Sequence, residues 1–391
     1  LLFTVPRVLH ALGITSSPLE MRLTVVTPDG LRTEATLAAM EPEEPFQSWY
    51  VRMSAGLFEP PPGVECVNAF GALRGDLPPH LAGLLPRARV MWFEHLEEAQ
   101  TLYVQLNVIG DTPEETFAEF NDRLWEYVDS HASAIDRLVF DLRFNRGGNG
   151  YLLLPFVHEL IKHEEFNQRG RLFALVGNTT FSAAVNLLGQ MIRHTQVTVV
   201  GEPTGGPLNW CSDIAFRLLP HSGLPLIVST LCWQGGHPSD TRGAHPPDFP
   251  VLTSGADFMA GDDPVLQAVL EDRVRALADV LRAEGAEAFR QEWQRQATSF
   301  ASLAWWTPFT EDELNALGYE MLEAGRVDDA IAAFELNTES HPHSSNALDS
   351  LAEGCYRKGD LDRATQLYRA SLGLDPGNEN ATRMLEKIQG E

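Results

Sequence analysis

The sequence predicts an α/β fold followed by an all-helical carboxy-terminal part. In the middle of the chain, over roughly 140 residues, short apolar runs that indicate buried strands alternate with amphipathic helical patterns, which is typical of a sheet covered by helices. The last eighty or so residues instead repeat with a period of 34 positions. A chain of 391 residues is long enough for two or three domains of this kind.

Each element of the middle region has its own local signal. Apolar runs predict four strands, at residues 137–142, 172–176, 197–200 and 226–231. One helix face after the second run carries apolar side chains at i, i+3, i+4, i+7 and i+8, namely Ala184, Leu187, Leu188, Met191 and Ile192. Residues 116–127 form a second amphipathic stretch. Before this region, residues 21–26 and 33–37 flank a Pro28-Asp-Gly30 turn and predict a β-hairpin.

The repeat near the carboxy terminus has a physical meaning at each matched position. A shift of 34 residues superposes Gly318 on Ala352 and Phe334 on Tyr368, so a small residue and an aromatic recur together. The small residue lets two antiparallel helices approach closely, and the aromatic fills the space between them. Pro342 and Pro376 follow the second helix of each pair, where a proline ends it. These positions resemble the tetratricopeptide repeat family.

Composition excludes several classes of function. Lys plus Arg number 29 and Asp plus Glu number 54, so the net charge is −25. Such a charge repels phosphate backbones and anionic lipid, and we therefore expect no nucleic-acid partner. No apolar run approaches the roughly 20 residues that span a bilayer. The four cysteines are widely spaced and contain no CxxC pair, so we expect neither a disulfide framework nor a zinc site.

Three glycine- and serine-containing motifs follow predicted strands. They are Asp141-Leu-Arg-Phe-Asn-Arg-Gly-Gly148, Thr180-Phe-Ser-Ala-Ala184 and Val200-Gly-Glu-Pro-Thr-Gly-Gly206. Strand ends in an α/β core hold reacting groups rigidly while leaving them accessible. Together with Pro247-Asp248 and Gly261-Asp-Asp-Pro264, their order resembles the tail-specific, or carboxy-terminal-processing, serine peptidase family. The likeness is closer to its branch near the tricorn core and the interphotoreceptor retinoid-binding protein.

The resemblance implies a domain plan. A crotonase-like (ClpP/crotonase) spiral core would span residues 90–272, and a partial PDZ-like, β-rich segment with its linker would occupy residues 1–75. A helical connector would follow at 273–309, and the tetratricopeptide repeats would cover 310–391. Members of this family are often exported in bacteria, which favours a periplasmic or secreted location, although the amino terminus at Leu1 does not itself indicate the compartment.

The same resemblance assigns candidate site residues. Ser182 stands at the position of the nucleophile, where a helix begins, and free amides of a first helical turn can stabilise an oxyanion. Gly147, Gly148 and the Ala183 N–H are the candidate oxyanion hole. Gly205 and Gly206 of the second glycine turn are candidates for substrate binding. The alternative interpretation of Ser182 is a helix N-cap, and Asp141 with Arg143 is better explained as a structural ion pair.

The general base is where the chain departs from the family. Bacterial members with a Ser–Lys dyad carry lysine where this chain has Pro207, and proline can accept no proton. A histidine and an acidic residue are the remaining route, as in the tricorn-like arrangement. Candidate histidines are His80, His95, His237 and His245, and Asp240 is the candidate acidic helper.

The predicted function is that of a serine-type hydrolase, a peptidase acting on polypeptide tails through an acyl-enzyme on Ser182, with no metal or organic cofactor. The repeats would dock a protein partner or the substrate. Two alternatives remain: an inactive peptidase fold that binds peptides or a small apolar ligand, and a scaffold that acts through its repeats alone.

Overall fold

The structure is a computed structural model that describes residues 10, 13–26, 30–38, 90–218 and 225–390. It divides into two compact units. One unit contains residues 1–89, 213–230 and 253–264, and the other contains 90–212, 231–252 and 265–391. The segment 261–264 belongs to the first unit, whereas the second unit holds the motifs at 141–148, 180–184, 200–206 and 247–248.

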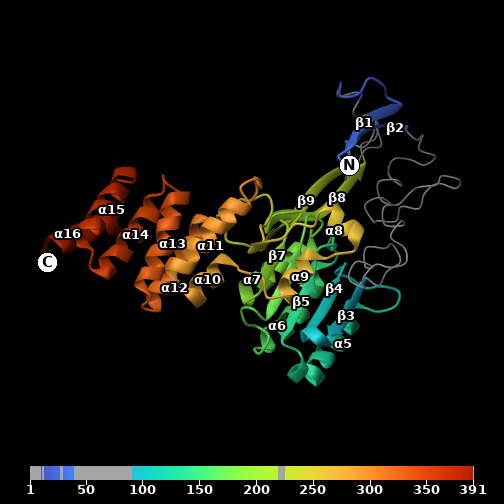
Figure 1. Ribbon diagram of the computed structural model, residues 1–391, viewed down its shortest axis with the longest axis horizontal. Coiled ribbons are helices and arrows are strands. Elements are labelled where there is room, and N and C mark those ends of the chain that lie inside the picture. The colour runs from blue at the N-terminus through green and yellow to red at the C-terminus, as the bar shows by residue number, and fades with distance from the viewer. Residues whose placement is uncertain (1–9, 11–12, 27–29, 39–89, 219–224, 391) are drawn as a thin grey trace. The chain divides into compact units, whose positions relative to one another are not determined.

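A mixed α/β core built on a parallel-rich sheet forms the first part of that unit (Figure 1). Six strands follow the order β10-β7-β6-β5-β4-β3, and every neighbouring pair is parallel except β3 with β4. Their bounds are β3 Met91–Leu96, β4 Thr101–Leu106, β5 Arg137–Asp141, β6 Leu172–Val176, β7 Thr198–Gly201 and β10 Phe249–Pro250. The strands predicted at 137–142, 172–176 and 197–200 are confirmed as β5, β6 and β7.

Successive side chains along the strands point to opposite faces of the sheet and belong to two separate apolar clusters. Leu138 and Phe140 of β5 join one apolar cluster, whereas Val139 between them joins another. The first cluster includes side chains of α5 (Phe117–His131), α6 (Leu153–Lys162) and α7 (Ala183–His194). The second includes side chains of α9 (Pro264–Leu270). Helices therefore cover both faces of the sheet, which explains why its central strands are continuous apolar runs.

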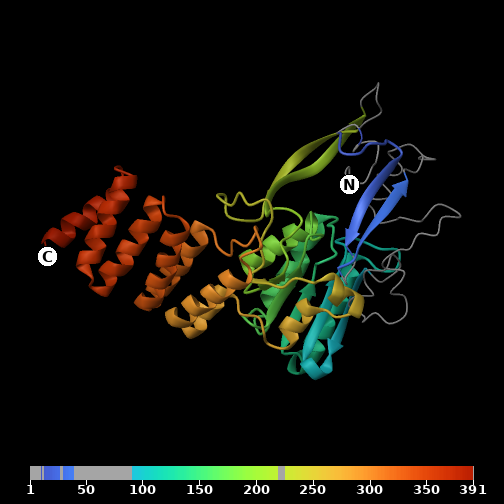
Figure 2. The same cartoon turned by 45° about the horizontal axis from the view of Figure 1, so that its top comes forward.

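Two pairs of strands lie outside this sheet. The predicted hairpin at 21–37 is confirmed as the antiparallel pair β1 (Glu20–Val26) and β2 (Arg32–Ala38). The run at 226–231 is a strand, but it belongs to β9 (Pro225–Gln234), which pairs only with β8 (Asn209–Leu218). Figure 2 shows β8 and β9 as a separate two-stranded ribbon. The strand predicted at 226–231 is therefore confirmed, and it carries exposed apolar side chains such as Ile227 and Val228.

The expectation that the cysteines form no disulfide was also wrong. Cys211 of β8 and Cys232 of β9 are disulfide-bonded, with their Cα atoms 3.9 Å apart. The two cysteines are 21 residues apart and match no sequence motif. Their sulfur atoms meet because the two strands pair. Cys355 is free and buried, and Cys66 lies outside the described residues.

Helices account for the remainder of the unit, and Figure 1 shows α12 to α16 stacked in chain order. Their bounds are α10 Leu277–Glu284, α11 Ala286–Ser299, α12 Glu311–Glu323, α13 Val327–Ser340, α14 Ser345–Lys358, α15 Leu361–Leu374 and α16 Glu379–Gly390. The helix α8 (Gly255–Ala260) belongs to the other unit. A single apolar cluster runs from Leu277 of α10 to Ala381 of α16. Phe334 and Tyr368, the matched aromatics of the 34-residue repeat, are both fully buried in it.

No helix among the described residues combines the length and the apolar composition needed to cross a membrane.

Candidate functional site

The three motifs meet at the carboxyl ends of adjacent parallel strands. The segment 141–148 follows β5, the segment 177–182 follows β6 and the segment 201–206 follows β7. Because these strands are hydrogen-bonded neighbours, their following turns are brought to one edge of the sheet. The three motifs therefore follow successive strands, as the sequence predicts, and lie together at this edge.

The turn after β5 is held by buried polar side chains. The Arg143 guanidinium donates to Asp141, at 2.6 Å from Nη2 to Oδ2, and the hydroxyl of Tyr103 donates to the same oxygen at 2.6 Å. Asp141 and Arg143 are both buried, so their pair is a structural ion pair within the described core. It fixes the point at which the chain leaves β5.

Asn145 connects this turn to its neighbours. Its side-chain amide donates to the Leu106 carbonyl at 2.8 Å, and its Oδ1 accepts the N–H of Gly147 at 2.8 Å. Its backbone carbonyl accepts the N–H of Phe181 at 2.9 Å. A single buried residue thus connects β4 and the glycine turn through its side chain and the segment that carries Ser182 through its backbone carbonyl.

Ser182 has an unusual backbone conformation at the start of α7. Its φ is 57° and its ψ is −127°, a combination that glycine adopts readily and that other residues adopt at a cost. Its side chain makes no capping hydrogen bond to the helix, unlike the N-cap threonines Thr116 and Thr310. The conformation therefore does not serve the helix end, and a serine on a strained strand-to-helix turn is the geometry that presents a nucleophilic hydroxyl.

Gly147 packs directly against Ser182. A Cβ on Gly147 would lie 2.4 Å from the Ser182 Cβ and 2.8 Å from the Ala183 nitrogen, so any larger residue would displace the serine. The N–H of Gly147 already donates to Asn145. Gly147 therefore contributes to the site because it has no side chain, which leaves room for Ser182. Among the described residues, the N–H groups of Gly148 and Ala183 have no recorded acceptor, so these two are the amides that remain for an oxyanion.

The second glycine turn contacts the other side of the serine segment. The N–H of Gly205 donates to the Thr180 carbonyl at 2.8 Å, and a Cβ on Gly206 would lie 3.0 Å from the Phe181 ring. The Thr204 hydroxyl donates to the Gly206 carbonyl at 2.7 Å and closes the turn. Gly205 and Gly206 therefore shape the wall beside Ser182, and Pro207 follows them half-buried.

His95 lies at the opposite edge of the sheet from Ser182. It is level with Leu102, Leu138 and Leu172 across the four strands, whereas Ser182 comes after Val176. The four steps from residue 172 to residue 176 alone span roughly 13 Å at about 3.3 Å per residue. The two ring nitrogens of His95 lie 3.2 Å from the Tyr127 hydroxyl and 3.2 Å from the Ala134 carbonyl. The structure does not bring His95 to the serine, and His80 lies outside the described residues.

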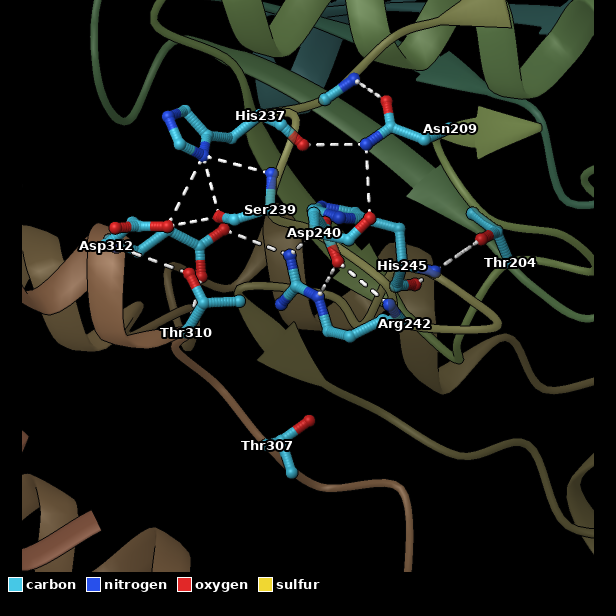
Figure 3. A network of polar contacts seen from close by, with 12 residues as sticks. Thr204, Asn209, His237, Ser239, Asp240, Arg242, His245, Thr307, Thr310 and Asp312 are labelled. Carbon is cyan, nitrogen blue, oxygen red and sulfur yellow. Dashed lines mark hydrogen bonds and ion pairs between the residues drawn. The ribbon is translucent and has the colours of Figure 1, made fainter. Parts of the chain in front are cut away.

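His237 and Asp240 belong to a polar network that reaches α12 (Figure 3). His237 Nδ1 lies 2.7 Å from the Ser239 hydroxyl and 3.3 Å from the Asp312 carboxylate. Asp240 accepts two hydrogen bonds from the Arg242 guanidinium, of 2.9 and 2.8 Å, and one from the Arg242 backbone N–H, of 3.0 Å. Arg242 also pairs with Glu313 at 3.0 Å. Burial raises the pKa of Asp240, but the bonds from Arg242 outweigh it and hold that pKa below its usual value. Both candidates are thus engaged with α12 and its neighbouring loop.

His245 is buried beside the same network. Burial and then the charge of Arg242 lower the pKa of its imidazole to about 4, so the ring is neutral near pH 7. Its backbone N–H donates to the Thr204 hydroxyl at 2.8 Å, and its carbonyl accepts the Thr204 N–H at 3.0 Å. His245 therefore supports the second glycine turn through its main chain.

Several residues that shape the site were not assigned a role from the sequence. Asn145 and Thr180 lie within the motifs, and the Thr180 hydroxyl donates to the Leu142 carbonyl while accepting the Gly177 N–H. The sequence signal that could have identified Asn145 and Thr180 is a polar residue at an otherwise apolar or glycine-rich strand end. Buried backbone groups at such a turn need hydrogen-bond partners, and a polar side chain can supply them.

A recess of about 530 Å³ lies elsewhere, between α5 and α6, lined by Trp125, Lys162 and several acidic side chains. It contains none of the motif residues.

Comparison with known proteins adds the following. No protein-family model and no curated protein sequence matches the chain. The chain is similar to solved structures of S41-family peptidases. A candidate peptidase from Parabacteroides merdae is 19% identical over 48% of this chain and 65% of that chain, with a TM-score of 0.33. A candidate S41 protease from Bacteroides fragilis is 15% identical over 48% of this chain and 57% of that chain, with a TM-score of 0.34. The photosystem II D1 C-terminal processing protease is 15% identical over 44% of this chain and 46% of that chain, with a TM-score of 0.28. The chain thus spans less than two thirds of the length of each.

Proposed function

We propose that the chain is a serine-type hydrolase of the tail-specific kind, which cleaves polypeptides through an acyl-enzyme on Ser182. The backbone of Ser182 carries this proposal. A φ of 57° at a non-glycine residue costs free energy, and the side chain makes no helix cap in return. A hydroxyl presented by a strained turn against a glycine is the arrangement expected of a nucleophile.

The surrounding residues supply the other parts of the reaction. The Ser182 oxygen would bond to the substrate carbonyl carbon, and the resulting oxyanion would accept hydrogen bonds from the N–H groups of Ala183 and Gly148. The bond from that carbon to the leaving nitrogen would then break as the nitrogen takes up the proton that the serine hydroxyl has lost. Water would next add to the acyl carbon, which frees the carboxyl product and returns a proton to the Ser182 oxygen. The close approach of Gly147 keeps the serine in place throughout.

Labelling with a fluorophosphonate probe tests this function. The wild-type chain should react at a single site, and Ser182→Ala should abolish the label. Ser133→Ala is the matched control, because Ser133 is exposed and lies outside the motifs, and it should label like wild type. Absence of label on folded wild-type protein would reject the hydrolase.

A non-catalytic peptide-binding protein is the second candidate. The observation that favours it is that no hydrogen bond to the Ser182 hydroxyl is present among the residues that the structure describes. Pro207 at the dyad position points the same way, because serine at its ordinary pKa is a weak nucleophile without a base. This candidate predicts peptide binding by calorimetry with neither label nor turnover.

The helices α12 to α16 would dock a protein partner or the substrate, as the tetratricopeptide likeness implies. Deleting residues 310–391 should then abolish partner capture, with hydrolysis by the remaining chain as the second readout.

A further inference from the structure

Two tryptophans of the β8/β9 ribbon stand directly opposite each other. The Cys211–Cys232 disulfide and the bond from the Gly235 N–H to the Leu208 carbonyl, at 3.0 Å, belong to one antiparallel register. That register pairs Trp210 with Trp233. Because successive residues of a strand alternate between faces, both indoles leave the ribbon on the face opposite the disulfide.

Both indoles are connected to the start of α7 or to the turn beside it. The Trp210 Nε1–H donates to the Asn186 side chain at 3.1 Å, and its ring lies 5.2 Å from the Phe181 ring. Asn186 is one helical turn beyond Ser182, and Phe181 immediately precedes it. Both residues that Trp210 contacts, Phe181 and Asn186, therefore lie within one helical turn of Ser182 in the chain.

Trp233 reaches the same place from the other side. Its ring lies 5.8 Å from that of Tyr151, and it would be 3.8 Å from a Cβ on Gly150. The same Cβ would be 3.5 Å from the Asn186 amide nitrogen and 3.9 Å from the Ala183 Cβ. Gly150 thus sits between Trp233 and the first turn of α7, with no side chain to separate them.

We call Phe181, Trp210, Trp233 and Tyr151 the aromatic platform. Tyr151 is 70% exposed and Phe181 is 40% exposed, and the two tryptophans are half-buried. A single exposed aromatic needs no explanation, but two pairs of rings beside the first turn of α7 form a concentrated apolar surface with polar neighbours. Aromatic groups of this kind bind flat or bulky apolar side chains through both buried area and ring geometry.

We propose that the aromatic platform binds an aromatic or large aliphatic side chain of a polypeptide beside the bond presented to Ser182. This inference rests on the proposed function for the position of the bond, but the binding surface itself does not require turnover. A polypeptide is the occupant because Ala183 lies beside Gly150, which Trp233 also approaches, and the N–H groups of Ala183 and Gly148 have no acceptor among the residues that the structure describes. Such amides suit a peptide carbonyl. The disulfide keeps the two tryptophans in register and so maintains the platform.

Binding of two short peptides to Ser182→Ala tests the platform without chemistry. Acetyl-Ala-Ala-Phe-amide should bind at least about ten-fold more tightly than acetyl-Ala-Ala-Ala-amide, as measured by calorimetry. Adding Trp233→Leu should remove most of this preference while leaving the weaker peptide unchanged. Trp305→Leu is the matched control, since Trp305 is also half-buried but lies outside the platform, and it should keep the preference.

The disulfide has its own variant. The pair Cys211→Ser and Cys232→Ser, checked for folding by circular dichroism, should lower the Phe-over-Ala preference several-fold. Equal affinity of Ser182→Ala for the two peptides, or an unchanged preference when Trp233→Leu is added to it, would overturn the platform.

Failure of the platform and failure of the hydrolase are separable. A chain that takes no fluorophosphonate label but prefers the Phe peptide keeps the platform and loses the enzyme. A chain that is labelled at Ser182 but binds both peptides equally keeps the enzyme and loses the platform.

Discussion

At the scale of single residues, Ser182 combines a strained backbone with the hydroxyl to which we assign the proposed reaction. Its backbone occupies a region that suits glycine, and its hydroxyl gives the helix nothing in return. Gly147 shows the complementary requirement, since a side chain there would collide with the serine. Strain that persists in a folded chain needs either a structural benefit or a functional one, and no capping benefit is present here.

Replacing Ser182 by glycine should therefore stabilise the protein while removing the proposed nucleophile. We expect Ser182→Gly to raise the free energy of unfolding by about 1–3 kcal/mol, because glycine relieves the strain at this φ. Ser182→Ala keeps the strained φ and should unfold like wild type. Chemical denaturation of the three proteins measures this, and equal midpoints for the glycine and alanine variants would contradict it.

His245 predicts a pH dependence of stability. Its folded-state pKa is lowered to about 4, whereas an unfolded histidine takes up a proton near 6.5. Between these values the unfolded chain binds the proton and the folded chain does not, so stability is present above 6.5 and is lost as the pH falls. Lowering the pH from about 7.5 to about 5.5 should cost roughly 1.4 kcal/mol through this residue.

The variant His245→Gln isolates that contribution, because the backbone bonds to Thr204 remain. The difference in unfolding free energy between wild type and variant should shrink by this amount over the same pH range. A difference that is independent of pH would show that the pKa of His245 is the same in the folded and unfolded chains.

At the scale of elements, the turns between strands and helices connect distant parts of the chain. Asn145 joins the β5 turn to the serine segment, and Thr204 joins the β7 turn to His245. Arg242 then links Asp240 with Glu313 at the start of α12 (Figure 3). In α12 itself, Gly318 permits the close approach of Phe334 from α13.

Gly318→Ala should loosen the helical part of the chain. The added Cβ would lie 2.2 Å from the Phe334 ring, and overpacking of this kind costs about 1–3 kcal/mol. Gly373→Ala in α15 is the matched control, because no atom lies within 4 Å of its added Cβ. That substitution should stabilise by about 0.5–1 kcal/mol through helix propensity. Thermal denaturation followed by circular dichroism distinguishes the two, and equal shifts would contradict the packing account.

At the scale of the whole molecule, charge is the dominant property. A net charge of −25 creates self-repulsion in the folded state that salt can screen. The ion pairs at the surface, such as Arg282 with Glu320, are partly exposed and individually weak. Repulsion across the surface should therefore outweigh the loss of these pairs when salt is added.

The melting temperature should rise as sodium chloride increases from about 20 to about 300 mM, because the Debye length shortens from roughly 20 Å to below 10 Å. Differential scanning fluorimetry measures this directly. A melting temperature that falls with salt would mean that the ion pairs stabilise the fold more than the net charge destabilises it.

The sequence by itself determined the local elements and their order. The apolar run at 172–176 predicted β6, and the spacing from Ala184 to Ile192 predicted α7. The pattern of Gly318 and Phe334 predicted helices that approach closely. Each depends on neighbours in the chain, because periodicity, turn residues and side-chain size act within a few positions. The placement of Ser182 at the start of a helix followed from the same local signals.

Only the tertiary structure decided which distant groups meet. It paired Cys211 with Cys232, assigned 226–231 to a ribbon outside the sheet, and set His95 at the edge away from Ser182. It also showed that the N–H of Gly147 donates to Asn145 and that the rings of the aromatic platform lie beside the start of α7. Such contacts depend on strand order and register over tens of residues, and the residues near any one position carry no record of them.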